Sequence, residues 1–172
     1  MFSFHKRARY MFSAGILPYA VVEGKIHFLV GMDAREFSLS DFGGRCEKGE
    51  TPKQTALREF HEETCGAILK PREESLSTCI MALTLSRTPY YMYLLQIPWS
   101  PHYPTYFNKI VGFVKHVALQ PHKKYCEKSH ILWVGVDELH HHKLRSVFRL
   151  TFFKNKESIL DLIGDTGKKG TL

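Results

Sequence analysis

Residues 44–66 read GRCEKGETPKQTALREFHEETCG, and this stretch determines most of what the sequence predicts. It contains three signals of a helix start: Thr51 as a capping residue, Pro52 at the first helical position and Gln54 at the third. Gly66 is typical of the residue that follows a helix. We therefore expect a helix that begins at Pro52 and ends close to Gly66.

This helix would have an acidic face beside an apolar one. Glu62 and Glu63 follow Glu59 by three and four residues, so the three carboxylates lie on one side of the helix. Leu57 and Phe60 point to another side. Because like charges at this spacing destabilise a helix, the acidic face is either a solvated surface or a site for a cation. Carboxylate oxygens of this kind are ligands for Mg²⁺ or Mn²⁺.

A pair of glycines precedes the helix. Gly43 and Gly44 allow the backbone to turn sharply and to approach a ligand closely. They would bring backbone carbonyl oxygens near the acidic edge, and carbonyls together with carboxylates suit a divalent cation. This context favours the cation site over the solvated surface.

The segment resembles the signature of the Nudix hydrolases, G-x(5)-E-x(7)-R-E-U-x-E-E-x-G-U, in which U is a bulky aliphatic or aromatic residue. The positions that match at the required spacing are Gly44, Glu50, Arg58, Glu59, Phe60, Glu62 and Glu63. The end of the segment departs from the signature, because Cys65 stands where the family has glycine and Gly66 comes one residue later. The departure concerns the exit of the helix and not the acidic residues.

The resemblance implies an α+β protein with a Nudix-type α/β/α sandwich around a central mixed β-sheet. Nudix hydrolases cleave a diphosphate linkage between a nucleoside or similar group and another moiety, usually with Mg²⁺ or Mn²⁺. The metal ligands implied here are Glu59, Glu62, Glu63 and the carbonyl of Gly44.

Other roles follow from the same resemblance. Arg58 keeps its proton, so we expect it to orient a neighbouring carboxylate. The general base would be Glu59 or Glu127, although Glu127 is also explained as an exposed loop charge. We expect Glu50 to support the loop and the helix start through hydrogen bonds.

The whole chain of 172 residues, 44% hydrophobic, predicts one domain over residues 1–172, with a basic segment at 1–10 and a loose tail at 164–172. Segment 1–10 has the charge of a short mitochondrial presequence but not the usual length or serine content. We expect an irregular stretch at 98–104 and a helix at 147–163. Strands or extended segments are predicted at 12–22, 25–31, 39–42, 77–85, 90–97 and 131–134.

Composition limits the compartment and the partners. The four cysteines lie far apart without a Cys-x-x-Cys pair, which favours a reducing, cytoplasmic environment. No apolar run is long enough to predict a membrane span. The formal net charge of +7 would attract a polyanion at long range.

Two mixed clusters of aromatic and basic residues are candidates for substrate binding. In the first, over residues 99–116, Tyr103 and Phe107 would stack on a base, although the same aromatics could belong to the core. In the second, Lys123, Lys124 and Tyr125 would contact phosphates.

These clusters and the basic charge make the capped end of RNA our first candidate substrate. The alternatives are (d)NTPs, ADP-ribose, NAD(H), dinucleoside polyphosphates and diphosphoinositol phosphates. A hypothesis of another class is a non-catalytic Nudix-fold module that binds RNA or a nucleotide. Such modules usually lack signature acids, and all of them are present here.

Overall fold

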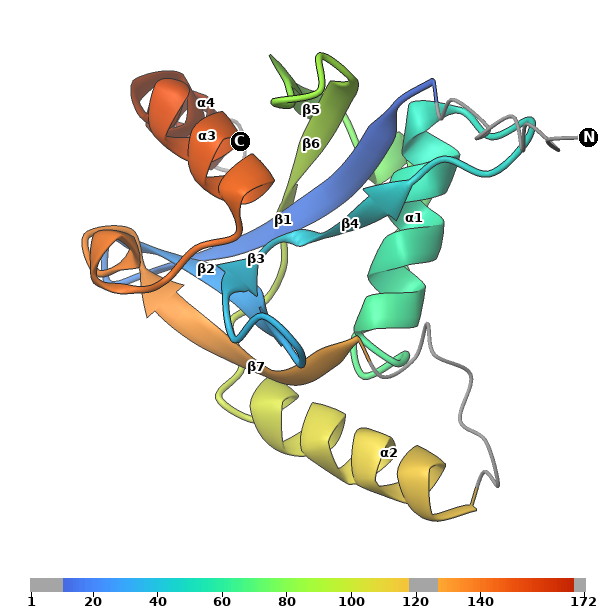
Figure 1. Ribbon diagram of the computed structural model, residues 1–172. Helices are drawn as coiled ribbons and strands as arrows, with labels where there is room; N and C mark the ends of the chain where they lie inside the picture. Colours follow the sequence, from blue (N-terminus) through green and yellow to red (C-terminus); the bar gives the residue numbers. More distant parts are fainter. Residues whose placement is uncertain (1–10, 118–126, 169–172) are drawn as a thin grey trace, which may run out of the picture.

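The computed structural model of the chain describes residues 11–117 and 127–168, with side chains described up to 164 (Figure 1). Short 3₁₀ turns lie at Glu73–Ser75 and Leu139–His141. The strands are β1 Ser13–Val22, β2 Lys25–Asp33, β3 Leu39–Ser40, β4 Phe42–Arg45, β5 Thr78–Leu83, β6 Pro89–Gln96 and β7 Lys128–Gly135. The helices are α1 Pro52–Glu63, α2 Tyr103–Val117, α3 Ser146–Lys154 and α4 Lys156–Lys168.

The strands form one mixed sheet of seven strands, in which β3, β2, β1, β6 and β5 are consecutive neighbours. Strand β1 is parallel to β6, whereas its pairings with β2 and β4 are antiparallel. Strand β7 pairs antiparallel with β2. The long strand β1 therefore pairs with β4 through its first half and with β2 through its second half, which places β4 beside the centre of the sheet.

The sheet separates two apolar layers, as the expected sandwich requires (Figure 1). Helices α1 and α2 cover one face, and α3 and α4 cover the other. Strand side chains alternate between the layers, since Phe28 and Val30 of β2 face α3 and α4 while Leu29 faces α1 and α2. The predicted α/β/α architecture is confirmed.

Helix α1 begins as the sequence predicts. The Thr51 hydroxyl accepts a hydrogen bond from the Gln54 N–H at 3.3 Å, and the Gln54 side chain accepts one from the Thr51 N–H at 3.1 Å. At its exit, Cys65 and Gly66 both adopt left-handed backbone, with φ of 52° and 68°. The exit therefore keeps the geometry that favours glycine, with Cys65 in a conformation that is costly for a residue with a Cβ.

Helix α2 was not predicted, and its position corrects one candidate site residue. Phe107 is fully buried and packs in the layer between α2 and the sheet, so it is a core residue and not a substrate contact. Tyr103 is half-buried against Trp133 of β7, with ring centroids 6.3 Å apart. The spacing of Tyr103, Phe107 and Val111, with Pro104 in the first turn, is helical, but the surrounding aromatic residues obscured it.

The C-terminal region differs from the prediction in two ways. The predicted single helix is divided into α3 and α4, because Asn155 leaves helical geometry and its side-chain amide donates to the Thr151 carbonyl at 2.8 Å. Helix α4 also continues to Lys168, so residues 164–168 are helical where a loose tail was expected. Residues 169–172, like the basic segment 1–10, lie outside the described residues. None of the described helices is long and apolar enough to cross a membrane.

Replacing Phe107 by Ala should lower the free energy of unfolding by about 3–5 kcal/mol, because it leaves a cavity beneath α2. Tyr106→Ala is the matched control, since its side chain is 50% exposed and its loss should cost less than about 1 kcal/mol. Urea unfolding followed by circular dichroism measures both. A stable Phe107→Ala protein with weakened nucleotide binding would restore Phe107 as a substrate contact.

Candidate active site

Helix α1 presents its acidic edge to the backbone of β4. A Cβ atom at Gly44 would lie 2.5 Å from both Cδ and Oε1 of Glu59, so the carboxylate rests directly against the glycine. Any side chain at position 44 would displace Glu59. The paired glycines therefore bring the backbone and the acidic residues together, as the sequence predicts.

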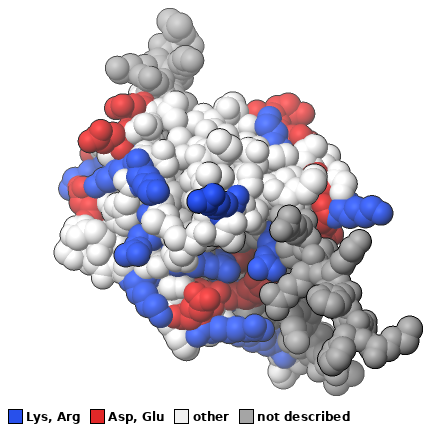
Figure 2. Space-filling model, turned by 45° about the horizontal axis from the view of Figure 1, so that its top comes forward, with Lys and Arg blue, Asp and Glu red and all other residues white. Residues whose placement is uncertain are grey.

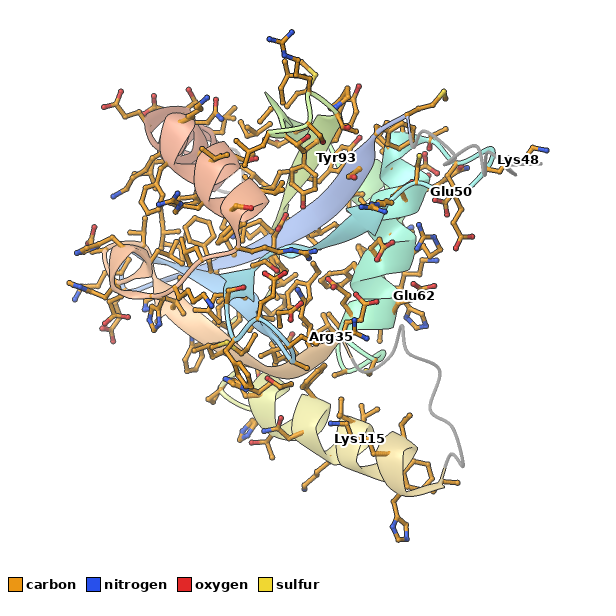
Figure 3. All side chains as sticks on the ribbon, viewed as in Figure 1. Arg35, Lys48, Glu50, Glu62, Tyr93 and Lys115 are labelled. Carbon is orange, nitrogen blue, oxygen red and sulfur yellow. The ribbon has the colours of Figure 1, made fainter. Side chains whose placement is uncertain are left out.

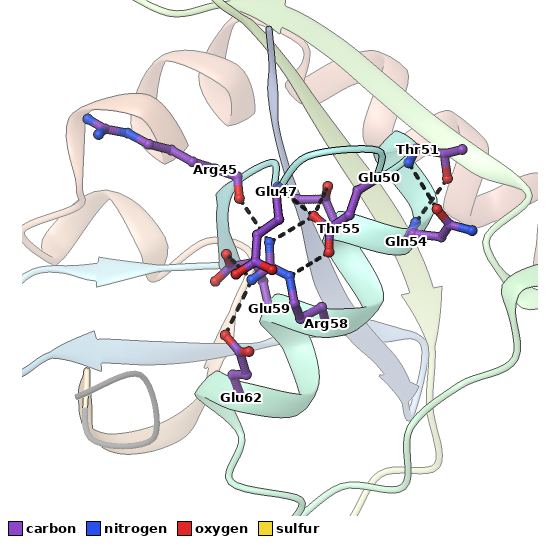
Figure 4. A network of polar contacts seen from close by, with 9 residues as sticks. All are labelled: Arg45, Glu47, Glu50, Thr51, Gln54, Thr55, Arg58, Glu59 and Glu62. Atoms are coloured by element: carbon purple, nitrogen blue, oxygen red, sulfur yellow. Dashed lines mark hydrogen bonds and ion pairs between the residues drawn. The ribbon is translucent and has the colours of Figure 1, made fainter. Parts of the chain in front are cut away.

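Arg58 is the centre of the polar network at this edge (Figure 4). Its Nη1 donates to Glu59 Oε1 at 2.7 Å and to Glu62 Oε2 at 3.3 Å. Its Nε donates to Glu50 Oε1 at 2.6 Å, and its Nη2 donates to the Arg45 carbonyl at 2.9 Å. One guanidinium thus orients two of the predicted metal ligands and fixes the loop between β4 and α1.

Glu50 has the supporting role that we expected from the sequence. Its carboxylate accepts hydrogen bonds from Arg58, from the Thr55 hydroxyl at 2.8 Å and from the Glu47 N–H at 2.8 Å. The bond from Arg58 is the main cause that lowers the pKa of Glu50 to about 2. Figure 3 places Glu50 in the loop before α1 and Glu62 further along that helix.

Glu63 is held differently, by a buried ion pair that sequence reasoning missed. Only 2% of Glu63 is exposed, and its Oε1 lies 3.3 Å from Nζ of Lys128, which is also buried. Its Oε2 accepts from the Gly43 N–H at 2.8 Å. Burial raises the pKa of Glu63 to about 7, although the charge of Lys128 acts in the opposite direction. Gly31 leaves room for the Lys128 stem, because a Cβ there would lie 2.9 Å from Lys128 Cδ.

A second buried acid, Asp41, lies beside the same lysine, whose Nζ donates to the Asp41 carbonyl at 3.4 Å. The Lys128 ammonium donates to the Ser40 hydroxyl at 2.6 Å, and the Tyr90 hydroxyl donates to Asp41 Oδ2 at 2.5 Å. Burial raises the pKa of Asp41 to about 6, against the effects of the Tyr90 hydrogen bond and the Lys128 charge. Lys128 and Ser40 are 88 positions apart, so the sequence had no local signal for this network.

Glu127 lies beside the acidic edge at the start of β7. Its carbonyl accepts from the Ala34 N–H at 2.8 Å, which anchors it to the loop after β2, and its side chain is exposed. Its charge contributes to raising the pKa of both Glu59 and Glu63, whose main cause is burial. The structure thus brings together the predicted Gly44, Arg58, Glu59, Glu62 and Glu63, with Glu127 next to them.

The two predicted substrate contacts that the structure describes lie on another helix. Tyr103 and Phe107 belong to α2, and Figure 3 shows Lys115 of the same helix well away from Glu62. Lys123, Lys124 and Tyr125 lie outside the described residues.

The donor set fits a hard divalent cation by its chemistry, because every candidate ligand is a carboxylate or carbonyl oxygen. Gly44 adds to the fit, since it leaves its backbone open to Glu59. Among the described residues, no three acidic, His or Cys side chains converge as a ready-made metal cage. Instead, Arg58 binds the oxygens of Glu59 and Glu62, and Lys128 binds Glu63.

Comparison with known families agrees with this geometry. The model of the NUDIX domain family matches residues 33–153, which include the paired glycines, helix α1 and Glu127. The chain belongs to the Nudix family. The enzymes of this family are hydrolases, and the Nudix match extends from the end of β2 into α3. No curated protein sequence is a significant match to this Nudix chain.

Solved structures show the Nudix fold at low sequence identity. The Nudix hydrolase RenU of M. smegmatis is 17% identical with a TM-score of 0.58, over 88% of each chain. The NUDIX domain of Shewanella oneidensis NrtR, solved with ADP ribose, is 12% identical with a TM-score of 0.57, over 92% of this chain and 94% of that one. An Ap4A hydrolase of C. elegans is 18% identical with a TM-score of 0.50, over 91% and 98%.

Replacing Lys128 by Met should lower the free energy of unfolding by about 3–5 kcal/mol at neutral pH, because the buried Glu63 loses its cation. Adding Glu63→Gln to that variant should recover much of the loss, since both charges are then absent. Urea unfolding of the two single variants and the double variant measures the coupling. Losses that simply add in the double variant would show that the pair is not coupled.

Replacing Asp41 by Asn should change how stability depends on pH. The pKa of Asp41 in the folded protein, about 6, is above its ordinary 3.8, so its contribution to stability is complete below pH 3.8 and is lost as the pH rises through 6. Relative to Asp41→Asn, the unmodified protein should therefore lose about 2 kcal/mol between pH 4 and pH 7.

Unfolding by urea at several pH values measures this difference. The exposed Asp137→Asn is the control and should show no such change with pH. A constant difference between Asp41→Asn and the unmodified protein would contradict the raised pKa.

Proposed function

We propose that this protein is a Mg²⁺- or Mn²⁺-dependent diphosphatase that hydrolyses the diphosphate linkage of a nucleotide-containing substrate. The observation that carries this proposal is the acidic edge of α1. There Arg58 binds Glu59 and Glu62, Lys128 binds Glu63, and Glu59 and Glu63 contact the glycine backbone of β4. Such an edge offers several hard oxygen ligands within a partly desolvated, preorganised frame.

The residues that would hold the ion are Glu59, Glu62, Glu63 and the carbonyl of Gly44. A bound divalent ion neutralises phosphate charge and lowers the pKa of a coordinated water. Arg58 keeps its charge at every accessible pH and fixes the orientation of Glu59 and Glu62. Glu50 in turn fixes Arg58 through two hydrogen bonds.

Two carboxylates are candidates for the general base. Glu59 is partly buried, and burial raises its pKa, which favours proton acceptance nearer neutral pH. Glu127 is exposed and close enough for its charge to act on Glu59. Glu127→Gln and Glu59→Gln distinguish the two, because only replacement of the base should remove the acidic limb from the pH profile of kcat, where activity rises as the base loses its proton.

The substrate panel contains the candidates that charge and similarity suggest. Capped RNA is a candidate because the net charge of the protein is +7. Figure 2, however, shows acidic side chains interspersed with the basic ones on the face that it presents. ADP-ribose and dinucleoside polyphosphates are candidate substrates because the similar structures include a domain solved with ADP ribose and an Ap4A hydrolase. The free thiols of Cys46 and Cys79 support a cytoplasmic location for this activity.

A non-catalytic Nudix-fold binding module is the competing function. Every signature acid is present and held in hydrogen-bonded geometry, which favours the hydrolase. A module that only binds would not need the like-charged glutamates, because their repulsion destabilises the helix without a cation.

Glu62→Gln should lower kcat by at least roughly 100-fold with Mg²⁺ or Mn²⁺, since it removes an ion ligand without uncovering a buried charge. The panel to assay is capped RNA, (d)NTPs, NAD(H), ADP-ribose, dinucleoside polyphosphates and diphosphoinositol phosphates, with product release as the measurement. Chelation by EDTA should stop turnover, and either ion should restore it.

Glu74→Gln, an exposed acid on the 3₁₀ turn after α1, is the matched control and should keep full activity. Turnover that survives in Glu62→Gln, or that persists in EDTA, would overturn the metal-dependent mechanism. Binding of a nucleotide with no turnover across the panel would favour the binding module.

A further inference from the structure

A large cavity lies on the face of β4 that is opposite to α1. It has a volume of about 1070 Å³, and its walls come from β4, from the turn between β5 and β6, and from the start of α3. These segments surround the upper middle of the molecule in Figure 1. The volume is at the upper end of the range for ligand pockets, so a nucleotide-sized group fits inside it.

The cavity and the acidic edge share one wall. Successive residues of a strand face opposite sides, and here Gly44 faces Glu59 while Gly43 faces the hydroxyl of Tyr90, which lines the cavity. Because both positions are glycine, the wall is only one backbone thick. Among the described strands, β4 pairs with β1 alone. A substrate whose diphosphate lies at the Gly44 end would therefore reach the cavity beside Gly43 around the other edge of β4.

Among the described residues, three arginines line this cavity: Arg45, Arg87 and Arg145. In the same part of the chain, Asp41 is the only acidic residue of the lining, and it is buried and bonded to Tyr90. The charge of Arg145 acts on Asp41 to lower its pKa, in agreement with the place of both residues in the lining. Within the described part of the chain, neither Arg87 nor Arg145 forms an ion pair.

The remaining lining is suited to the same kind of ligand. Arg87 lies in a turn that is ordered by hydrogen bonds from the Arg87 N–H to the Thr84 carbonyl at 2.9 Å and from the Thr88 N–H to Thr84 Oγ1 at 3.0 Å. Hydroxyls of Ser86 and Thr88 also line the cavity. The first turn of α3 has no acidic residue and no side-chain cap, so its N–H groups add positive potential. Arginines with hydroxyls recognise phosphate oxygens, whereas an uncharged nucleoside needs none of them.

We propose that this cavity binds a phosphate group of the substrate other than those of the cleaved diphosphate. The proposal rests on the proposed function and narrows it to substrates that carry at least one additional phosphate. That phosphate is either a monoester on a small nucleotide or a diester of an RNA chain.

The test compares pairs of substrates that differ in the additional phosphate. NADPH and NADH differ by one phosphate monoester, and a capped RNA oligonucleotide and the cap dinucleotide differ by the chain phosphates. In one of the two pairs, the unmodified protein should have a kcat/KM at least tenfold higher for the member with the additional phosphate. The pair that shows the preference identifies the source of the phosphate.

Arg145→Gln and Arg87→Asn should each reduce that preference at least fivefold, and asparagine tolerates the left-handed backbone at position 87. Arg149→Gln is the matched control, because Arg149 lies on α3 outside this cavity and its replacement should leave the preference unchanged. Thermal unfolding verifies that the variants fold. Equal kcat/KM within both pairs, or equal losses for both members in the arginine variants, would overturn the proposal.

The cavity can be tested even if the protein is not a hydrolase. If no substrate is turned over, the equilibrium Kd of each pair takes the place of kcat/KM. Tighter binding of the member with the additional phosphate, lost in Arg145→Gln, would still support the cavity as a phosphate site. Equal binding of both members would reject it whatever the catalytic activity.

Discussion

The guanidinium of Arg58 joins helix α1 to the loop that precedes it, and the geometry of the acidic edge depends on this contact. Without it, Glu59 and Glu62 would repel each other on one side of the helix. Glu50 makes the arrangement rigid, because it binds Arg58 and also accepts hydrogen bonds from Thr55 and from the loop backbone. The carboxylates are therefore held in place before any cation or substrate arrives, which reduces the reorganisation that binding requires.

Glu63 illustrates a different solution to the same electrostatic problem. It is too deeply buried for water to screen its charge, and a buried lysine from β7 neutralises it. A buried pair of this kind gives little net stability, because both charges lose their hydration. The role of the pair is to position Glu63, since it fixes this side chain against the Gly43 N–H and links three strands to the end of the helix.

The paired glycines separate two chemically different environments. On one side of β4 the surface is acidic and suits a cation, and on the other side a cavity with three arginines suits an anion. A side chain at either glycine would fill the space that Glu59 or Tyr90 occupies. The thin wall thus places cation ligands and phosphate ligands within reach of one extended, phosphorylated molecule.

Local chemistry is what the sequence by itself determined. The capping box at Thr51, the shared face of Glu59, Glu62 and Glu63 and the glycine pair depend on contacts within a few residues, so spacing alone predicts them. The sandwich followed from the family resemblance that these residues carry. Only the tertiary structure decided that Phe107 is core, that Lys128 neutralises Glu63 and that three arginines share a cavity. Those contacts join segments far apart in the chain, and burial rather than residue type determines what each side chain does.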